Sequence, residues 1–200
     1  MSQDILTTLG LTAQELTEIV RENPSLRGFL SGYISEYKLR KFFAADKRIS
    51  NVRKYDDHDR SKKSDIVFTY KGVDISVEVK SLQTNSIRKE NEAFFGKTQV
   101  DASDKRPVKL PNGKTVNTTC LLIGEFDLLA VNLYGFENKW NYIFVQNTDL
   151  PRSNFRGYTP AQKKYLIATL IGVNWPVQPP FTDDPFPLLD EIVKTKQVKK

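Results

Sequence analysis

Cysteine and histidine are scarce in this sequence, and their scarcity removes several kinds of site. Among the 200 residues, Cys120 is the one cysteine and His58 the one histidine. A lone cysteine excludes an internal disulfide framework and a cysteine-rich zinc site, and a lone histidine excludes every site built from two or more histidines. No apolar run approaches the ~20 residues that a membrane span needs, and the opening stretch lacks the pattern of a signal peptide. We therefore expect a soluble, cytoplasmic protein.

Enough apolar material is present for a folded core. Apolar residues make up 39% of the chain and aromatic residues 11%. A chain of this length suits one domain, which buries roughly two-thirds of the surface that the unfolded chain exposes. The sequence contains no internal repeat and no interdomain linker. A single domain spanning 1–200 is the expectation.

The positive charge is concentrated in one segment. Lys and Arg number 30 against 24 for Asp and Glu, and ten basic side chains lie between Lys38 and Lys63 with four aspartates. A basic segment of this kind is expected where a protein contacts a phosphate backbone. The alternative is a solvated basic loop without a partner. The phosphate contacts predicted from this segment are Lys38, Arg40, Lys41, Arg53, Lys54, Lys62 and Lys63.

Helices are expected at the start of the chain and strands in its middle. Thr12 with Glu15 forms a capping-box pattern, and Pro24 is placed to begin a second helix, so 12–44 is predicted to hold N-terminal helices. A polar loop follows over 45–64. A hairpin is expected over 65–80, and a polar region with a short helix near 90–95 over 81–107. Within 107–172 we expect a second hairpin with its turn at Pro111-Asn112-Gly113, apolar strands, and a helix that begins at Thr159 and ends near Gly172. A surface-wrapping tail is expected over 173–200.

The hairpin carries the strongest chemical signal. With Lys71 and Gly72 as its two loop residues, counting gives the pairs Tyr70–Val73, Phe68–Ile75 and Ile66–Val77 on one apolar face. On the other face Asp65 lies opposite Glu78, and Lys80 follows two residues later. Opposed carboxylates destabilise a sheet unless a cation binds them, and Mg²⁺ accepts one or two carboxylates while it keeps waters. The alternative is an exposed hairpin face with weak surface salt bridges.

This spacing resembles the signature of a nuclease superfamily. Asp65, twelve intervening residues and then Glu78-Val79-Lys80 resembles the PD-(D/E)xK motif of restriction endonucleases and junction resolvases, with Ser64 where the family often has proline. The resemblance implies an α/β restriction endonuclease-like core, a mixed sheet of about five strands with helices on both faces. It also implies Mg²⁺ (Mn²⁺ can substitute) held by Asp65, Glu78 and the main-chain carbonyl of Val79. Lys80 would then position or deprotonate the attacking water and help to stabilise the transition state.

Further residues follow from the same resemblance. Glu36, on the N-terminal helix, is the candidate for a second metal position, and Gln99 is a candidate for approaching phosphate or metal. Arg152 and Arg156 are predicted DNA contacts that could read guanine edges, although simple phosphate or solvent contact is the alternative. Apart from the resemblance, Asp127 precedes Leu128 and Leu129 in a strand-like run, so it is expected to cap or kink that strand or to add a carboxylate near the sheet edge.

The function implied is Mg²⁺-dependent hydrolysis of phosphodiester bonds in double-stranded DNA, as in a type II restriction enzyme. A palindromic target would require a homodimer, and a cognate methyltransferase could accompany the chain. Three alternatives stay open: a structure-specific nuclease of the Holliday junction resolvase kind, a non-catalytic DNA-binding module of the same fold, and a basic interaction protein whose hairpin is only structural.

Overall fold

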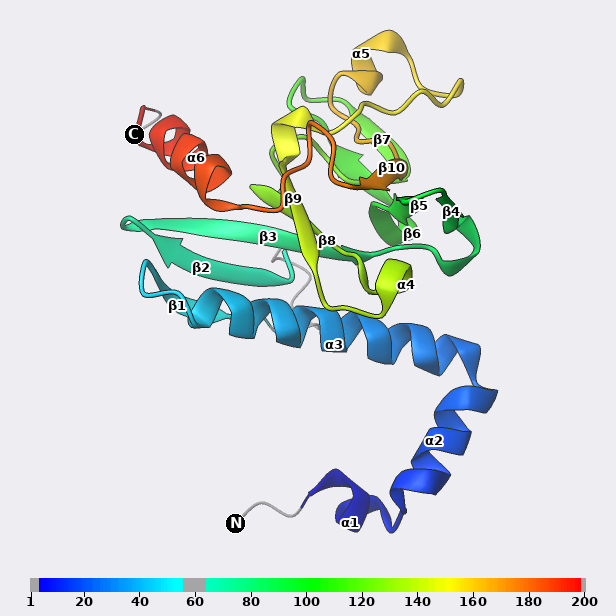
Figure 1. Cartoon of the computed structure of the whole chain (residues 1–200). Helices are drawn as coiled ribbons and strands as arrows, with labels where there is room; N and C mark the ends of the chain where they lie inside the picture. The colour runs from blue at the N-terminus through cyan, green and yellow to red at the C-terminus, as the bar shows by residue number, and fades with distance from the viewer. Residues whose placement is uncertain (1–3, 56–63, 199–200) are drawn as a thin grey trace. The chain divides into compact units, whose positions relative to one another are not determined.

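The computed structural model describes residues 4–55 and 64–198 (Figure 1). The chain divides into two compact units, Met1–Ile34 and Ser35–Lys200. Predicted contacts at Lys62 and Lys63 lie outside the described residues, as does His58. Among the residues described, no helix has both the length and the apolar character that crossing a membrane requires.

The first unit is helical, as the sequence predicts. It holds α1 (Ile5–Leu9), α2 (Ala13–Glu22) and the first part of α3 (Pro24–Ala44). The predicted capping box is present: the Glu15 carboxylate accepts from the Thr12 N–H at 2.7 Å, and the Glu15 N–H donates to Thr12 Oγ1 at 3.2 Å. These two bonds satisfy backbone donors that the first turn of α2 would otherwise leave unpaired. Helix α1 was not predicted.

The second unit is built on a five-stranded mixed sheet, which confirms the predicted fold class. Its strand order is β1-β2-β3-β8-β9; β3 and β8 are parallel, and the other neighbours are antiparallel. A three-stranded sheet has the order β10-β5-β4, and β6 pairs with β7. The bounds are β1 Ile49–Arg53, β2 Ile66–Tyr70, β3 Val73–Ser81, η1 Thr84–Ser86, β4 Arg88–Glu90, β5 Ala93–Gln99, β6 Asp101–Lys109, β7 Thr115–Cys120, β8 Leu128–Asn132, α4 Tyr134–Glu137, β9 Tyr142–Gln146, η2 Asn147–Asp149, α5 Pro160–Lys163, β10 Leu170–Trp175 and α6 Phe186–Val198.

The two faces of the large sheet are covered differently. On one face, the strands pack with α3 and α6 in a core that includes Leu39, Phe43, Leu189, Ile192 and Val193. On the other face, the covering side chains come from the small sheet and its loops, among them Val100, Ile171 and Val173. The expectation of helices on both faces is therefore wrong, because strands rather than helices supply the second apolar layer.

Two local predictions fail because short strands with one solvent-exposed face look polar in sequence, and one predicted helix is shorter than expected. Strand β1 lies in the expected loop 45–64, and β4, β5 and β6 occupy the region where a loop and a short helix were expected. The predicted helix from Thr159 ends at Lys163, and the chain then forms β10, whose residues alternate between exposed and buried. The predicted second hairpin is confirmed as β6–β7.

The C-terminal segment is part of the core, so its description as a surface-wrapping tail is wrong. Leu189, Ile192 and Val193 in α6 are 5% exposed or less, at the spacing of one helical face. Tyr70 donates to Asp190 at 2.8 Å and so ties the helix to β2. The buried apolar residues of α6 are thus spaced to line the face of the helix that packs on the sheet.

We predict that Ile192→Ala lowers the free energy of unfolding by about 2–5 kcal/mol, because it removes buried methyl groups and leaves a cavity. Urea denaturation followed by circular dichroism measures this. Val198→Ala is the matched control on the same helix, since Val198 is 87% exposed, and it should leave stability nearly unchanged. Equal effects of the two substitutions would contradict the placement of α6 in the core.

Candidate active site

The hairpin β2–β3 has the register that the sequence predicts. Ile66 pairs with Val77, Phe68 with Ile75 and Tyr70 with Val73. Lys71 and Gly72 form the turn with φ angles of 48° and 76°. Positive φ at both central residues is the requirement of the tight hairpin turn that matches strand twist. Period-two alternation therefore places Glu78 and Lys80 on the same face of β3.

Asp65 lies immediately before β2 and reaches β3 with its side chain. Its N–H donates to the Val77 carbonyl at 3.1 Å, and its Oδ2 accepts from the Val79 N–H at 2.7 Å. The strand pairing runs only as far as Ile66 and Val77. A side-chain bond thus takes the place of the strand pairing that counting predicted for Asp65, and it holds the carboxylate beside β3.

Glu78 and Lys80 form a half-buried ion pair. Lys80 Nζ lies 2.7 Å from Glu78 Oε1, with side-chain exposures of 24% and 12%. Burial removes much of the water that would otherwise solvate both charges, so each depends on its protein neighbours. An exposed hairpin face with surface salt bridges is therefore not what the structure contains.

The surroundings change how all three groups titrate. Burial raises the pKa of Glu78 to about 7, and the negative charge of Asp65 adds to the effect. Burial also raises the pKa of Asp65, although the Lys80 ammonium and the Val79 N–H oppose this change. For Lys80, burial acts to lower the pKa, but Glu78 and Asp65 outweigh it and the pKa is raised overall. Lys80 therefore stays an ammonium at neutral pH.

Glu36 joins this group from α3. Its charge contributes to the raised pKa of Asp65, which places the two carboxylates within electrostatic reach. Lys54 Nζ lies 2.7 Å from Glu36 Oε2, and the two side chains are 21% and 15% exposed. Through Asp65, the four predicted catalytic residues are thus within electrostatic reach in one region of the structure. Lys54 was predicted to contact phosphate, and its ammonium is ion-paired with the Glu36 carboxylate.

Two acidic residues near the site were missed by sequence reasoning. The charge of Asp101 contributes to the raised pKa of Lys80, and that of Glu125 to the raised pKa of Glu78. Gln99 Nε2 donates to Asp101 Oδ1 at 3.0 Å, so Gln99 is linked to the site through Asp101. Asp101 could have been identified from the sequence, because it lies two residues after the predicted site residue Gln99. No sequence pattern pointed to Glu125, because it reaches the site only through the fold.

The remaining predicted DNA contacts are dispersed. Lys38 and Lys41 are exposed on α3, whereas Arg40 is half-buried, 5.9 Å from the centre of the Tyr37 ring. Arg156 is exposed. Arg152 is exposed too, and its guanidinium donates to the Thr148 carbonyl at 3.1 Å and to the Leu150 carbonyl.

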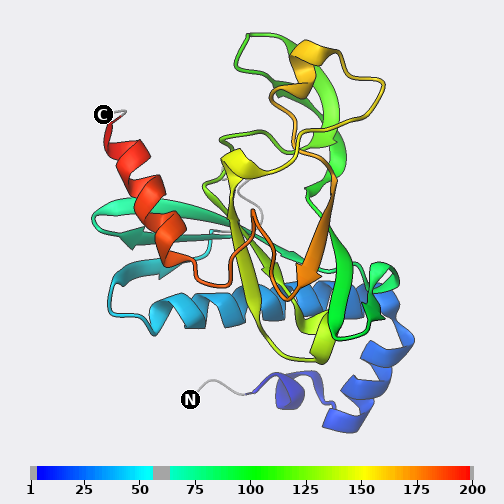
Figure 2. The same ribbon diagram turned by 45° about the horizontal axis from the view of Figure 1, so that its top comes forward.

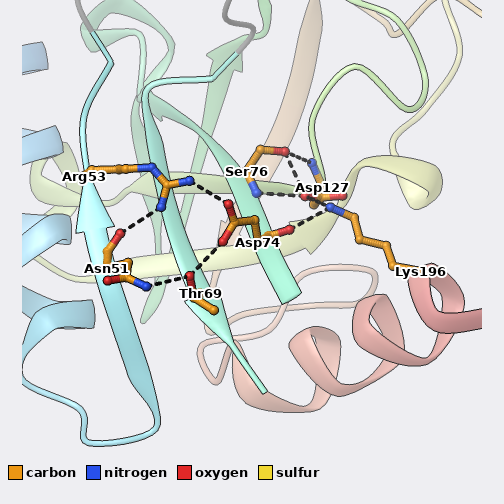
Figure 3. Close-up of polar contacts among 7 residues, drawn as sticks. All are labelled: Asn51, Arg53, Thr69, Asp74, Ser76, Asp127 and Lys196. Carbon is orange, nitrogen blue, oxygen red and sulfur yellow. Dashed lines mark hydrogen bonds and ion pairs between the residues drawn. The ribbon is translucent and has the colours of Figure 1, made fainter. Parts of the chain in front are cut away.

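Arg53 belongs to a separate polar network nearer the turn of the hairpin (Figure 3). Its Nη2 lies 2.6 Å from Asp74 Oδ2, and Asp74 also accepts from Thr69 at 2.7 Å. Asp74 is four residues before Glu78 on the same strand, which is about 13 Å. Arg53 therefore forms an ion pair with Asp74 and lies apart from the four catalytic candidates.

Asp127 joins β3, β8 and α6 in the same region. Its Oδ2 accepts from the Ser76 N–H at 2.7 Å and from Lys196 Nζ at 2.6 Å (Figure 3). The Lys196 ammonium also donates to the Asp74 carbonyl at 2.9 Å. Of the expected roles for Asp127, capping the beginning of its strand is the one that the structure contains.

Comparisons with known proteins add little. No protein-family model matches the chain, and no curated protein matches it. A solved structure described as "a bacterial homing endonuclease: I-Ssp6803I" matches with a TM-score of 0.35 and 20% identity, covering 68% of this chain and 86% of that chain. A TM-score of this size supports no conclusion about function, so the chemistry of the site has to carry the functional assignment.

We predict that, in EDTA, the free energy of unfolding falls as pH rises from about 4.5 to about 7. Folding raises the pKa of Glu78 from its ordinary 4.5 to about 7, so the folded protein holds a proton that the unfolded chain releases. The contribution is present below pH 4.5 and is lost as pH rises through 7, on the order of 1–3 kcal/mol. Urea titrations at several pH values measure it.

Glu78→Gln is the control for this measurement, because glutamine keeps the shape of the side chain and cannot titrate. The pH-dependent part of the stability should be smaller in the variant. An identical pH dependence in both proteins would show that Glu78 has an ordinary pKa.

Proposed function

We propose that this protein is a Mg²⁺-dependent endonuclease that hydrolyses phosphodiester bonds in double-stranded DNA. The observation that carries the proposal is the half-buried group of Asp65, Glu78 and Lys80, with Lys80 Nζ 2.7 Å from Glu78 and the Asp65 carboxylate fixed by the Val79 N–H. Buried acidic groups with raised pKa values beside a fixed ammonium are typical of functional sites and costly for stability alone.

The donor groups suit magnesium better than zinc. Over residues 4–55 and 64–198, no three His, Cys, Asp or Glu side chains gather closely enough to form a complete ligand set. Mg²⁺ needs no such set, since it binds through one or two carboxylates and keeps several waters. Asp65, Glu78 and the carbonyl of Val79 would hold it, and Glu36 would serve a second ion. Bound Mg²⁺ supplies Lewis-acid stabilisation of negative charge on the phosphate.

Lys80 is the residue that we assign to the attacking water and the transition state. Because its pKa is raised, it is a hydrogen-bond donor at neutral pH and not a free base. An ammonium held in one place can orient a water for in-line attack on phosphorus and can donate to a phosphate oxygen as charge develops. Of the two roles expected for Lys80, positioning fits its protonation state better than deprotonating the water.

The finer assignment is a type II restriction enzyme of the PD-(D/E)xK kind, with Mn²⁺ able to replace Mg²⁺. It is supported by the spacing of Asp65, Glu78 and Lys80 and by the chain's net charge of +6. The same assignment includes a homodimer on a palindromic target and a cognate methyltransferase. It implies products with a 5′-phosphate and a 3′-hydroxyl.

We predict that Lys80→Ala lowers the rate of DNA cleavage at least about 100-fold while the protein stays folded, because it removes a fixed charge from the transition state. The assay is incubation of unmethylated phage DNA with Mg²⁺ or with EDTA, followed by electrophoresis. Discrete fragments from the wild type with Mg²⁺ only are the expected result. Lys71→Ala, at the exposed turn of the same hairpin, is the matched control and should cut normally.

Several outcomes would count against the proposal. Equal cleavage by the wild type and Lys80→Ala would show that Lys80 has no role in catalysis. Cleavage that persists in EDTA would show that the reaction does not need a metal. If the wild type cuts no linear DNA with either Mg²⁺ or Mn²⁺, restriction of duplex DNA is wrong, and cleavage of a four-way junction would then identify a structure-specific nuclease.

A further inference from the structure

Strands β6 and β7 form a two-stranded ribbon with a small core of its own. Lys109 pairs with Thr115, and Val108 with Val116. The α5 region packs on it: Thr118 Oγ1 lies 2.6 Å from the Tyr158 hydroxyl. The shared core is Val108, Leu110, Val116, Cys120 and Leu166, with Leu122, Tyr158 and Tyr165 against it. Figures 1 and 2 show β6, β7 and α5 side by side in both views. We call residues 101–120 and 153–166 the ribbon lobe.

The ribbon lobe is strongly basic. It contains two acidic residues, Asp101 and Asp104, against seven basic residues, a net charge of +5. The seven are Lys105, Arg106, Lys109, Lys114, Arg156, Lys163 and Lys164. A positive charge confined to so few residues is expected to attract a polyanion.

The two faces of the ribbon differ in character. Val108 and Val116 face the small core and are 8% and 9% exposed. The opposite face is open to solvent and displays Lys105, Pro107 and Lys109 from β6 and Thr115 and Asn117 from β7. Lys105 and Lys109 lie about 13 Å apart along the strand, and Lys114 extends the positive face into the turn. The outer face is thus a narrow polar strip with cations along its length.

The base of the ribbon adjoins the candidate active site. Thr98 Oγ1 donates to the carbonyl of Ser81, the residue after Lys80, at 3.1 Å, and Gln99 donates to Asp101, the first residue of β6, at 3.0 Å. Further along β6, Arg106 Nη2 lies 3.3 Å from Glu125 Oε1. A polyanion lying along the ribbon would therefore lie beside the residues proposed to cut it.

We infer that the β6–β7 ribbon is a duplex-DNA-binding element that inserts into the major groove, with Lys105, Lys109 and Lys114 contacting phosphates. The major groove of B-form DNA is ~12 Å wide and admits a two-stranded β-ribbon. The major groove of double-stranded RNA is deep and too narrow for protein side chains to read, so the shape of the ribbon selects DNA. The inference rests on the proposed function and names the part of the chain that would hold the DNA substrate.

The test compares two triple variants, each in the full chain with Lys80→Ala to prevent cleavage. Lys105→Gln/Lys109→Gln/Lys114→Gln removes the ribbon cations, and Lys71→Gln/Lys139→Gln/Lys194→Gln removes three exposed lysines elsewhere. Fluorescence anisotropy with a labelled 30-base-pair duplex gives Kd at several salt concentrations. The ribbon variant should bind about tenfold or more weakly, and its slope of log K against log salt should shrink by about 2–3, since each phosphate contact contributes ~0.9.

The control variant should keep the wild-type slope. Equal losses in both variants would overturn the inference, because net charge alone would then explain the binding. Tighter binding of an RNA duplex of the same sequence would also overturn it. Circular dichroism melts confirm that both variants are folded.

The cleavage assay separates this inference from the proposed function. With Lys80 intact, the ribbon variant should need about tenfold more DNA for half-maximal cleavage. If the wild type cuts DNA and the ribbon variant cuts and binds like it, the inference fails and the proposed function stands. If the wild type cuts no DNA but binds duplex through the ribbon lysines, the proposed function fails and the ribbon remains a binding element.

Discussion

The hydrogen bond from the Val79 N–H to the Asp65 carboxylate sets the geometry of the candidate active site. Strand β2 begins at Ile66, so the edge of β3 beyond Val77 has no β2 backbone to pair with. Asp65 supplies the missing acceptor with its side chain at 2.7 Å. A carboxylate used in this way cannot turn to solvent without leaving a buried N–H unpaired, which costs ~1–3 kcal/mol. The end of a strand therefore becomes a place where an acidic group is held against its neighbours.

The other charges gather around that carboxylate from separate parts of the fold. Helix α3 contributes Glu36, β3 contributes Glu78 and Lys80, and the beginning of β6 contributes Asp101. Each element is anchored by one of the two apolar layers of the large sheet, so the charged groups are held by cores on both sides. Excess negative charge held in partial burial destabilises a protein, and a bound cation that neutralises it recovers the loss.

The sequence predicted what depends on local pattern and missed what depends on distant contacts. The register of β2–β3 was predictable because alternation and the Lys71-Gly72 turn specify it together. Helix α2 was predictable from its capping box. The β6–β7 ribbon was only partly predicted, since β6 exposes most of its side chains and resembles a loop. The pairing of Lys54 with Glu36 and the approach of Glu125 arise from tertiary structure, which no spacing in the sequence reveals.

The ribbon lies within the long crossover between the parallel strands β3 and β8. Part of this crossover belongs to the core, since Val100 and Leu121 pack in the second apolar layer. The turn between β6 and β7 is exposed over residues 111–114, and the entropic cost of closing a loop grows only with the logarithm of its length, so residues can be added there at small thermodynamic cost. Asp65, Glu78 and Lys80 all precede the crossover. A longer or shorter turn is therefore expected to change the reach of the ribbon without moving these three residues.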